Sequence, residues 1–141
     1  MQYSSDVAVA VEPTLVYPYV ADLVRYVEWM PMVHDVEAVG DGVWNVELRA
    51  KVGVFARSKR LRMKRTVNTS QHIVFERDEI DGKRHSPWTM SIALQSADAG
   101  CVVTVDLSYG GSLWTAGILD RVLAAQVEAG KTGLAHVVHG A

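Results

Sequence analysis

The chain of 141 residues carries a formal net charge of −2 and has a pI of about 6.2. A chain of this length buries roughly 68% of its unfolded surface in one core, so we expect a single domain spanning residues 1–141. The near-neutral charge excludes a global attraction to nucleic acid or to anionic membranes. Cys101 is the only cysteine, which excludes an intramolecular disulfide and fits a reducing compartment.

The sequence shows no targeting or membrane signal. The N-terminus "MQYSSDVAVAVEP" lacks the basic segment and the long apolar run of a signal peptide. No run approaches the roughly 18 apolar residues of a membrane-spanning helix. We therefore expect a cytoplasmic protein without an integral membrane segment.

The chain begins with a strand and a short helical region. "VAVAV" (Val7 to Val11) is rich in β-branched residues and ends just before Pro13. From Thr14 onward, apolar residues recur at helical spacing, which predicts an amphipathic helix with Thr14 as its N-cap.

The stretch "ADLVRYVEWMPMV" (residues 21–33) continues the helical pattern until Pro31 ends it. Trp29, Met30 and Met32 therefore lie where the helical segment gives way to the second strand. Two interpretations stay open for this cluster: a plug that closes the core, or a gate that touches a ligand.

Six strands follow in the middle of the chain, separated by turn sequences such as "GDG", "DGK" and "ADAG". Apolar and polar residues alternate along them, so that Trp44, Val46 and Leu48 share one face. Short turns predict a mostly antiparallel sheet with one buried face.

A long C-terminal helix is predicted from Ser112, as N-cap, to about Val138. This helix must cover the buried face of the sheet, and a cleft between the two is the natural ligand site. The glycines at 117, 130 and 133 weaken it by up to about 1 kcal/mol each. They indicate close packing, fraying or room for a ligand.

The sequence "VADLVRYVEWMPMV" resembles the "DL-x-x-Y-x-x-W/F-x-P" signature of the START-like superfamily, also called SRPBCC. This superfamily includes polyketide cyclase/dehydrase-like and coenzyme Q-binding proteins. The element order and "SYGGSLW" before the last helix agree with it, and the resemblance covers the whole chain. It implies an α+β helix-grip fold: a seven-stranded curved antiparallel sheet around a long C-terminal helix, with two short helices after the first strand and a hydrophobic cavity.

The predicted ligand-binding residues are those expected on the concave face, at the end of the helical segment and on the last helix. Methionine adapts to irregular ligands, and tryptophan and tyrosine offer apolar area with one polar tip. Any of these residues could equally be plain core. They are Trp29, Met32, Trp44, Val46, Leu48, Met63, Arg65, Phe75, Arg77, Trp88, Met90, Val105, Tyr109, Leu119 and Leu123.

Two arginines are predicted on the concave face. Arg65 shares its parity with Leu61 and Met63, and Arg77 shares its parity with Phe75. A buried unpaired cation is costly. Each side chain therefore either reaches outward from a strand end or binds a ligand carboxylate or carbonyl.

The basic run "RSKRLRMKR" raises a nucleic-acid interpretation. Alternation places Arg60, Arg62 and Lys64 on the outer face, with Lys64 opposite Glu76 and Arg62 opposite Asp78. Such pairs contribute roughly 0.2–1 kcal/mol each. They favour a solvated charged face, so we expect no nucleic-acid partner.

No metal or cofactor is expected. His136 and His139 stand three apart, but no cysteine or carboxylate cluster accompanies them. No Ser/His/Asp or Cys/His arrangement can be assigned from the spacing.

The leading functional hypothesis is a monomeric or homodimeric protein that binds or carries a hydrophobic small molecule: a lipid, an isoprenoid quinone or a polyketide-like compound. One alternative is an enzyme of the polyketide cyclase/dehydrase kind, in which Tyr109, Arg65 or His34 moves protons or polarises a carbonyl. Another is a protein-interaction module, like the relatives that act on ribosome or toxin systems.

Overall fold

The computed structural model describes residues 2–52, 55–110 and 118–140, apart from the side chains of residues 52, 55, 57 and 118–120. Within these residues the elements follow the predicted order of strand, short helices, six strands and long helix. They are β1 (Gln2–Val9), α1 (Pro13–Ala21), the 3-10 helix η1 (Leu23–Glu28), β2 (Val33–Gly40), β3 (Val43–Val52), β4 (Phe55–Asn68), β5 (His72–Arg77), β6 (Trp88–Ala97), β7 (Gly100–Tyr109) and α2 (Ile118–Gly140).

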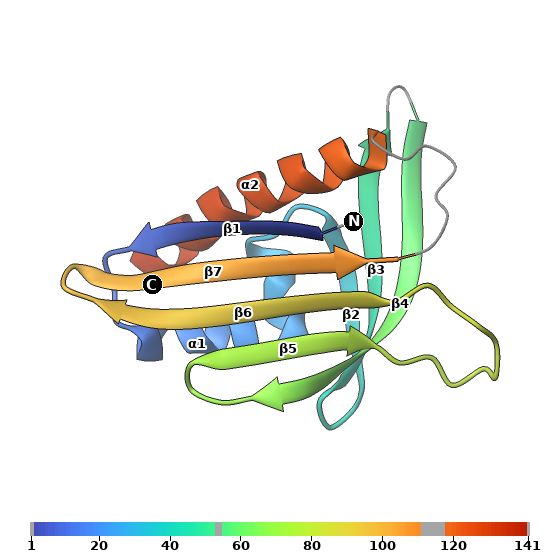
Figure 1. The fold of residues 1–141 in the computed structure, drawn as a ribbon, viewed down its shortest axis with the longest axis horizontal. Helices are drawn as coiled ribbons and strands as arrows, with labels where there is room; N and C mark the ends of the chain where they lie inside the picture. Colours follow the sequence, from blue (N-terminus) through green and yellow to red (C-terminus); the bar gives the residue numbers. More distant parts are fainter. Residues whose placement is uncertain (1, 53–54, 111–117, 141) are drawn as a thin grey trace.

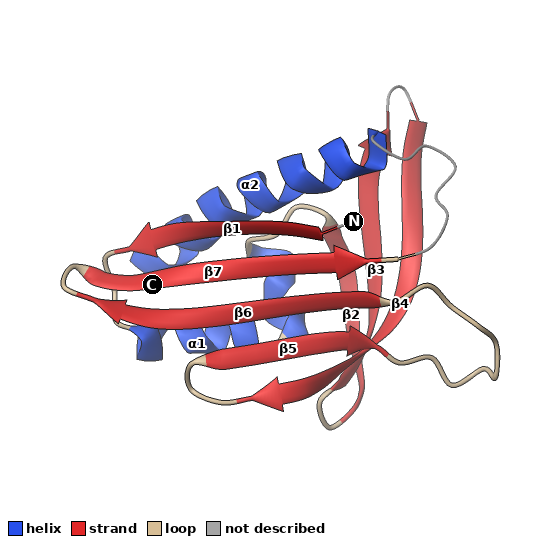
Figure 2. Cartoon of the chain, viewed as in Figure 1, coloured by secondary structure: helices blue, strands red, loops and turns tan. Residues whose placement is uncertain are grey.

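The strands form one antiparallel sheet in the order β1-β7-β6-β5-β4-β3-β2. The sheet is strongly bent. β1, β7, β6 and β5 run side by side, while β4, β3 and β2 turn steeply away from them (Figure 1). The helices lie on one side of the sheet (Figure 2). This arrangement confirms the predicted helix-grip fold.

Alternation along the strands decides which side chains enter the core. On β6, Trp88, Met90, Ile92 and Leu94 are buried and their neighbours are not. Arg60, Arg62 and Lys64 of β4 occupy the opposite face, and the register places Lys64 opposite Glu76, as predicted. A period of two therefore separates an apolar concave face from a charged outer face.

The first helix begins at Pro13, so the predicted N-cap at Thr14 is wrong. Proline suits the first helical turn because its missing N–H would have no partner there. The helix ends at Ala21, because Asp22 adopts an extended conformation. The Asp22 carboxylate then accepts a hydrogen bond from the Val24 N–H (3.0 Å), which caps η1.

Trp29 is buried at the junction between η1 and β2. Its indole Nε1–H donates to the carbonyl oxygen of Tyr19 (2.9 Å), and its ring centroid lies 4.5 Å from that of Tyr26. Helix α2 crosses directly over this residue. A Cβ atom at Gly133 would lie only 2.1 Å from the Trp29 carbonyl oxygen.

Gly133 therefore allows α2 to pass close to the backbone at Trp29, whereas Gly130 is not required for this approach. A Cβ atom at Gly130 would lie 3.5 Å from Met30 Cε, an ordinary van der Waals distance, whereas Gly133 has no such room. The predicted Ser112 cap and Gly117 lie outside the described residues.

Gly133→Ala should lower the free energy of unfolding by about 2–3 kcal/mol, because the new methyl group collides with backbone rather than with a flexible side chain. Gly130→Ala is the matched control in the same helix. It should be neutral, or stabilising by up to about 1 kcal/mol, because alanine favours helix. Urea unfolding followed by circular dichroism measures both, and equal effects of the two substitutions would contradict the close crossing.

Candidate functional site

An apolar hollow of about 40 Å³ lies between the concave face of the sheet and the η1–β2 segment. Its wall is entirely apolar. Small-molecule pockets typically measure roughly 300–1,000 Å³, so a ligand of that size requires the hollow to widen. The lining residues are Leu23, Tyr26, Met30, Met32, Val33, Val46, Leu48, Leu61, Met63, Trp88, Met90 and Leu107.

Two features keep this wall apolar and adaptable. The hydroxyl of the fully buried Tyr26 donates to the Val20 carbonyl oxygen (2.8 Å), and burial raises the Tyr26 pKa well above its usual value. Four of the lining residues are methionines. Unbranched methionine side chains change rotamer readily and fill irregular spaces, so this wall can adapt its shape through its side chains.

The apolar residues and Tyr109 of the predicted ligand-binding set divide, where their side chains are described, into two groups. Those that line the hollow are Met32, Val46, Leu48, Met63, Trp88 and Met90. Those buried in the core without lining it are Trp29, Trp44, Phe75, Val105, Tyr109 and Leu123. The side chain of Leu119 lies outside the described residues.

Arg65 holds the C-terminal end of α1. Its Nη1–H donates to the Ala21 carbonyl oxygen (2.6 Å), and its guanidinium carbon lies 5.5 Å from the centroid of the Trp44 ring. The last carbonyls of a helix lack intrahelical partners and carry partial negative charge. The Arg65 cation therefore stabilises the junction between α1 and the sheet.

Arg77 holds the loop between β5 and β6. Its side chain is 8% exposed, and its Nε lies 2.9 Å from Glu79 Oε2. Nη1 donates to the Ser86 carbonyl oxygen (3.2 Å), and Nη2 lies 3.2 Å from His85 Nδ1. Because arginine only donates, Nδ1 is the acceptor. The His85 proton therefore resides on Nε2, which lies 2.8 Å from an Asp81 carboxylate oxygen.

The three catalytic candidates contact different groups. Tyr109 stacks on Trp88, with ring centroids 5.0 Å apart. His34 is exposed on the outer face, and its Nε2 lies 3.7 Å from Glu47 Oε2. With Arg65 bound to α1, the structure does not bring the three into one site.

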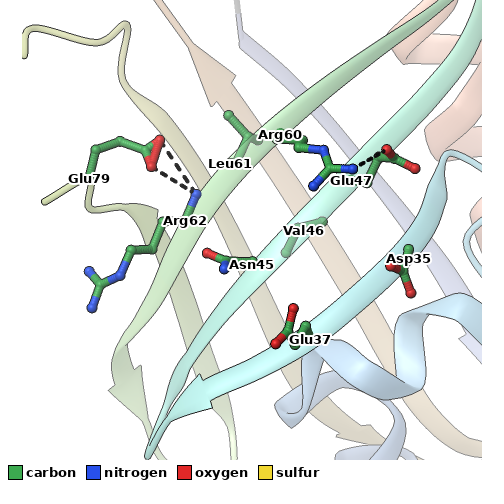
Figure 3. Close-up of a pocket in the computed structure, with 9 residues that line it drawn as sticks. All are labelled: Asp35, Glu37, Asn45, Val46, Glu47, Arg60, Leu61, Arg62 and Glu79. Carbon is green, nitrogen blue, oxygen red and sulfur yellow. Dashed lines mark hydrogen bonds and ion pairs between the residues drawn. The ribbon is translucent and has the colours of Figure 1, made fainter. Parts of the chain in front are cut away.

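The outer face of β2, β3 and β4 carries a second depression, of about 240 Å³, lined mainly by charged side chains (Figure 3). Arg60 Nη2 lies 3.3 Å from Glu47 Oε1, and Arg62 Nη1 lies 3.4 Å from Asp78 Oδ2. The Arg62 backbone N–H donates to the Glu79 carboxylate (3.2 Å). These pairs match the charged face predicted from alternation.

A polar latch joins α2 to β1. The Glu128 carboxylate accepts hydrogen bonds from Lys131 Nζ (2.9 Å), the Tyr3 hydroxyl (2.7 Å) and the Ser5 hydroxyl (2.8 Å). These donors, Lys131 foremost, lower the pKa of Glu128 to about 2. The latch holds the helix beside the edge strand of the sheet.

We next compare the predictions about metal sites and membrane-spanning segments with the described residues. His139 Nε2 accepts the Ala10 N–H (2.9 Å), near the end of α2. Within residues 2–52, 55–110 and 118–140, no group of three or more His, Cys, Asp or Glu side chains is placed to hold a metal ion. No helix in that part of the chain combines the length and apolarity needed to cross a bilayer.

Alternation would have identified some residues that the predicted set omits. Leu61 precedes Met63 by two on β4, and Lys59 precedes Leu61 by two, so both share its face. Met30 was already expected in the cluster at the end of the helical segment. Tyr26 gave no such signal, because its position depends on how η1 packs beneath the sheet.

Glu128→Gln should destabilise the protein at pH 6, and the difference from the wild type in the free energy of unfolding should shrink as the pH falls to 3. A carboxylate with a lowered folded-state pKa stabilises the fold above its unfolded value of about 4.5 and loses this contribution as the pH falls toward about 2. The measurement is urea unfolding of both proteins from pH 6 to pH 3. Glu37→Gln controls for the change in net charge, and a pH-independent difference for Glu128→Gln would contradict the latch.

Comparisons with known proteins agree with this fold. A comparison with curated proteins finds no match. The structure is similar to a START superfamily protein from Mycobacterium smegmatis, with a TM-score of 0.80 and 15% identity over 99% of this chain and 97% of that one. It is also similar to the Zhui aromatase/cyclase from Streptomyces sp. R1128, with a TM-score of 0.68 and 19% identity over 99% of this chain and 93% of that one.

Structural likeness at this level of identity establishes the fold alone. The family is established by the sequence itself, because the family described as polyketide cyclase/dehydrase and lipid transport matches residues 1–139. The chain therefore belongs to this family, and its fold is that of the START superfamily protein to which it is similar.

Proposed function

We propose that this protein binds a small hydrophobic molecule, such as a lipid, an isoprenoid quinone or a polyketide-like compound, in the hollow beneath the bent half of the sheet. The observation that carries this proposal is the wall, which is entirely apolar and contains four methionines. The family, described by polyketide cyclisation or dehydration and lipid transport, supports the same class of ligand.

Binding would draw its free energy from desolvation of the ligand. Each buried methylene group contributes about 0.8 kcal/mol, and the ligand gains this when methionine side chains move aside. The surrounding frame resists wider change, since Trp29 is hydrogen-bonded to Tyr19 and α2 is held by Glu128. The proposal is therefore a site that widens through its side chains.

The geometry favours binding over catalysis. Within the described residues, the wall of the hollow offers no acid–base pair, and Tyr109, Arg65 and His34 lie apart. Cyclase-type chemistry belongs to the Zhui aromatase/cyclase by its name, and a shared fold does not transfer it. A cytoplasmic location and a monomeric or homodimeric state remain predictions.

Leu48→Phe should weaken binding of the neutral fluorescent probe N-phenyl-1-naphthylamine by at least about tenfold, because the larger ring fills the hollow. Leu15→Phe, the same change on the exposed face of α1, should leave binding unchanged. Probe fluorescence titration measures both. Native mass spectrometry of the purified wild-type protein should also reveal a co-purifying apolar molecule.

Two results would contradict the proposal. One is equal probe affinity in the wild type and Leu48→Phe, with circular dichroism showing that both are folded. The other is the absence of any binding of apolar molecules by the folded wild-type protein.

A further inference from the structure

The sheet changes its pairing beside the hollow. β5 stops at Arg77, whereas β4 begins at Phe55, so the first half of β4 has no β5 residue beside it. The Asp78 N–H still donates to the Arg62 carbonyl oxygen (2.9 Å), but the Arg62 N–H donates to the Glu79 carboxylate instead of to a strand. From here β4 turns steeply away from β6 (Figure 1).

Lys59 lies on the concave side of β4 in this region. It precedes Leu61 and Met63 at intervals of two residues, and its register partner on β3 is Leu48. All three of these residues line the hollow. Lys59 is half-buried, whereas its neighbour Arg60 is exposed on the outer face. Its side chain therefore begins at the rim of the apolar hollow.

The charge of Lys59 is not neutralised by a direct contact. Arg77, which lies opposite Met63 in the register, is paired with Glu79. Lys59 makes no hydrogen bond or ion pair with any side chain that the structure describes. Burial, followed by the positive charge of Arg77, lowers the pKa of Lys59, while Glu79 acts in the opposite direction.

This lack of a partner sets Lys59 apart from the other half-buried basic side chains of the described residues. Each of the others has an acceptor: Arg25 pairs with Glu28, Arg62 with Asp78, Arg65 with Ala21, Arg77 with Glu79 and Lys131 with Glu128. A partly desolvated cation without an acceptor is unfavourable. One additional negative group beside Lys59 would remove that cost.

We propose that Lys59 binds the carboxylate of an amphipathic monoanion whose apolar tail occupies the hollow. This inference rests on the proposed function and narrows it to a carboxylic acid with an apolar chain or ring. A single charge fits the site, because Glu79 already balances Arg77 and leaves one cation unpaired. The ammonium donates to the carboxylate, which is a charge-assisted hydrogen bond.

The test compares two ligands that share one chain, dodecanoate and dodecan-1-ol, by isothermal titration calorimetry. Wild type should bind dodecanoate at least about tenfold more tightly than the alcohol. Lys59→Met retains the length of the side chain without the charge and should lose this preference, with the affinity for the alcohol unchanged or improved. Lys59→Arg should keep the preference.

Lys64→Met is the matched control, since it removes a lysine from the outer face of the same strand. It should keep the preference of the wild type. Circular dichroism shows whether each variant is folded. If Lys59→Met does not fold, the affinities of folded Lys59→Arg for dodecanoate and dodecan-1-ol still test the proposal.

The possible failures are distinguishable. If the wild type binds dodecanoate and dodecan-1-ol with equal affinity, the proposed role of Lys59 is wrong, but the proposed hydrophobic binding site is not contradicted. A carboxylate preference that survives in folded Lys59→Met, or that is lost in folded Lys59→Arg, overturns it too. Binding of neither compound overturns both this inference and the proposed function.

Discussion

The close crossing of α2 over Trp29 is the constraint on which the arrangement of the core depends. A glycine at 133 brings the helix backbone against the Trp29 carbonyl, and the Trp29 indole is fixed in turn by the Tyr19 carbonyl. Met30, the next residue in the chain, packs beside Gly130 of α2. It also lines the wall of the hollow. Met30 thus connects the packing of α2 with the wall of the hollow.

Most polar groups on the concave side stabilise the fold, and one, Lys59, lies at the rim of the hollow. Arg65 stabilises the end of α1, and Arg77 stabilises the loop between β5 and β6. Tyr26 turns its hydroxyl to the Val20 carbonyl. Because each of these groups has its own hydrogen-bond partner away from the hollow, the wall of the hollow is apolar. Lys59 is left at its rim without an acceptor among the described residues. This division supports the proposed binding function.

The fold and the faces of the strands followed from local patterns in the sequence. Alternation with a period of two depends only on backbone geometry, so the burial of Trp88 and Met90 was predictable. The partner of a long side chain depends on tertiary structure, and the contact of Arg65 with Ala21, 44 residues away, left no local trace. The size of the hollow depends on packing between η1 and the sheet, which no sequence pattern encodes.

The claim that ligand enters this particular hollow is tested most directly by ¹³C-methyl NMR of the methionines during a titration with dodecanoate. The account predicts that the methyl resonances of Met30, Met32, Met63 and Met90 all shift, because these side chains line the wall and move aside to admit the tail. Saturable binding that leaves these four resonances unchanged would contradict it, since the ligand would then lie elsewhere on the protein.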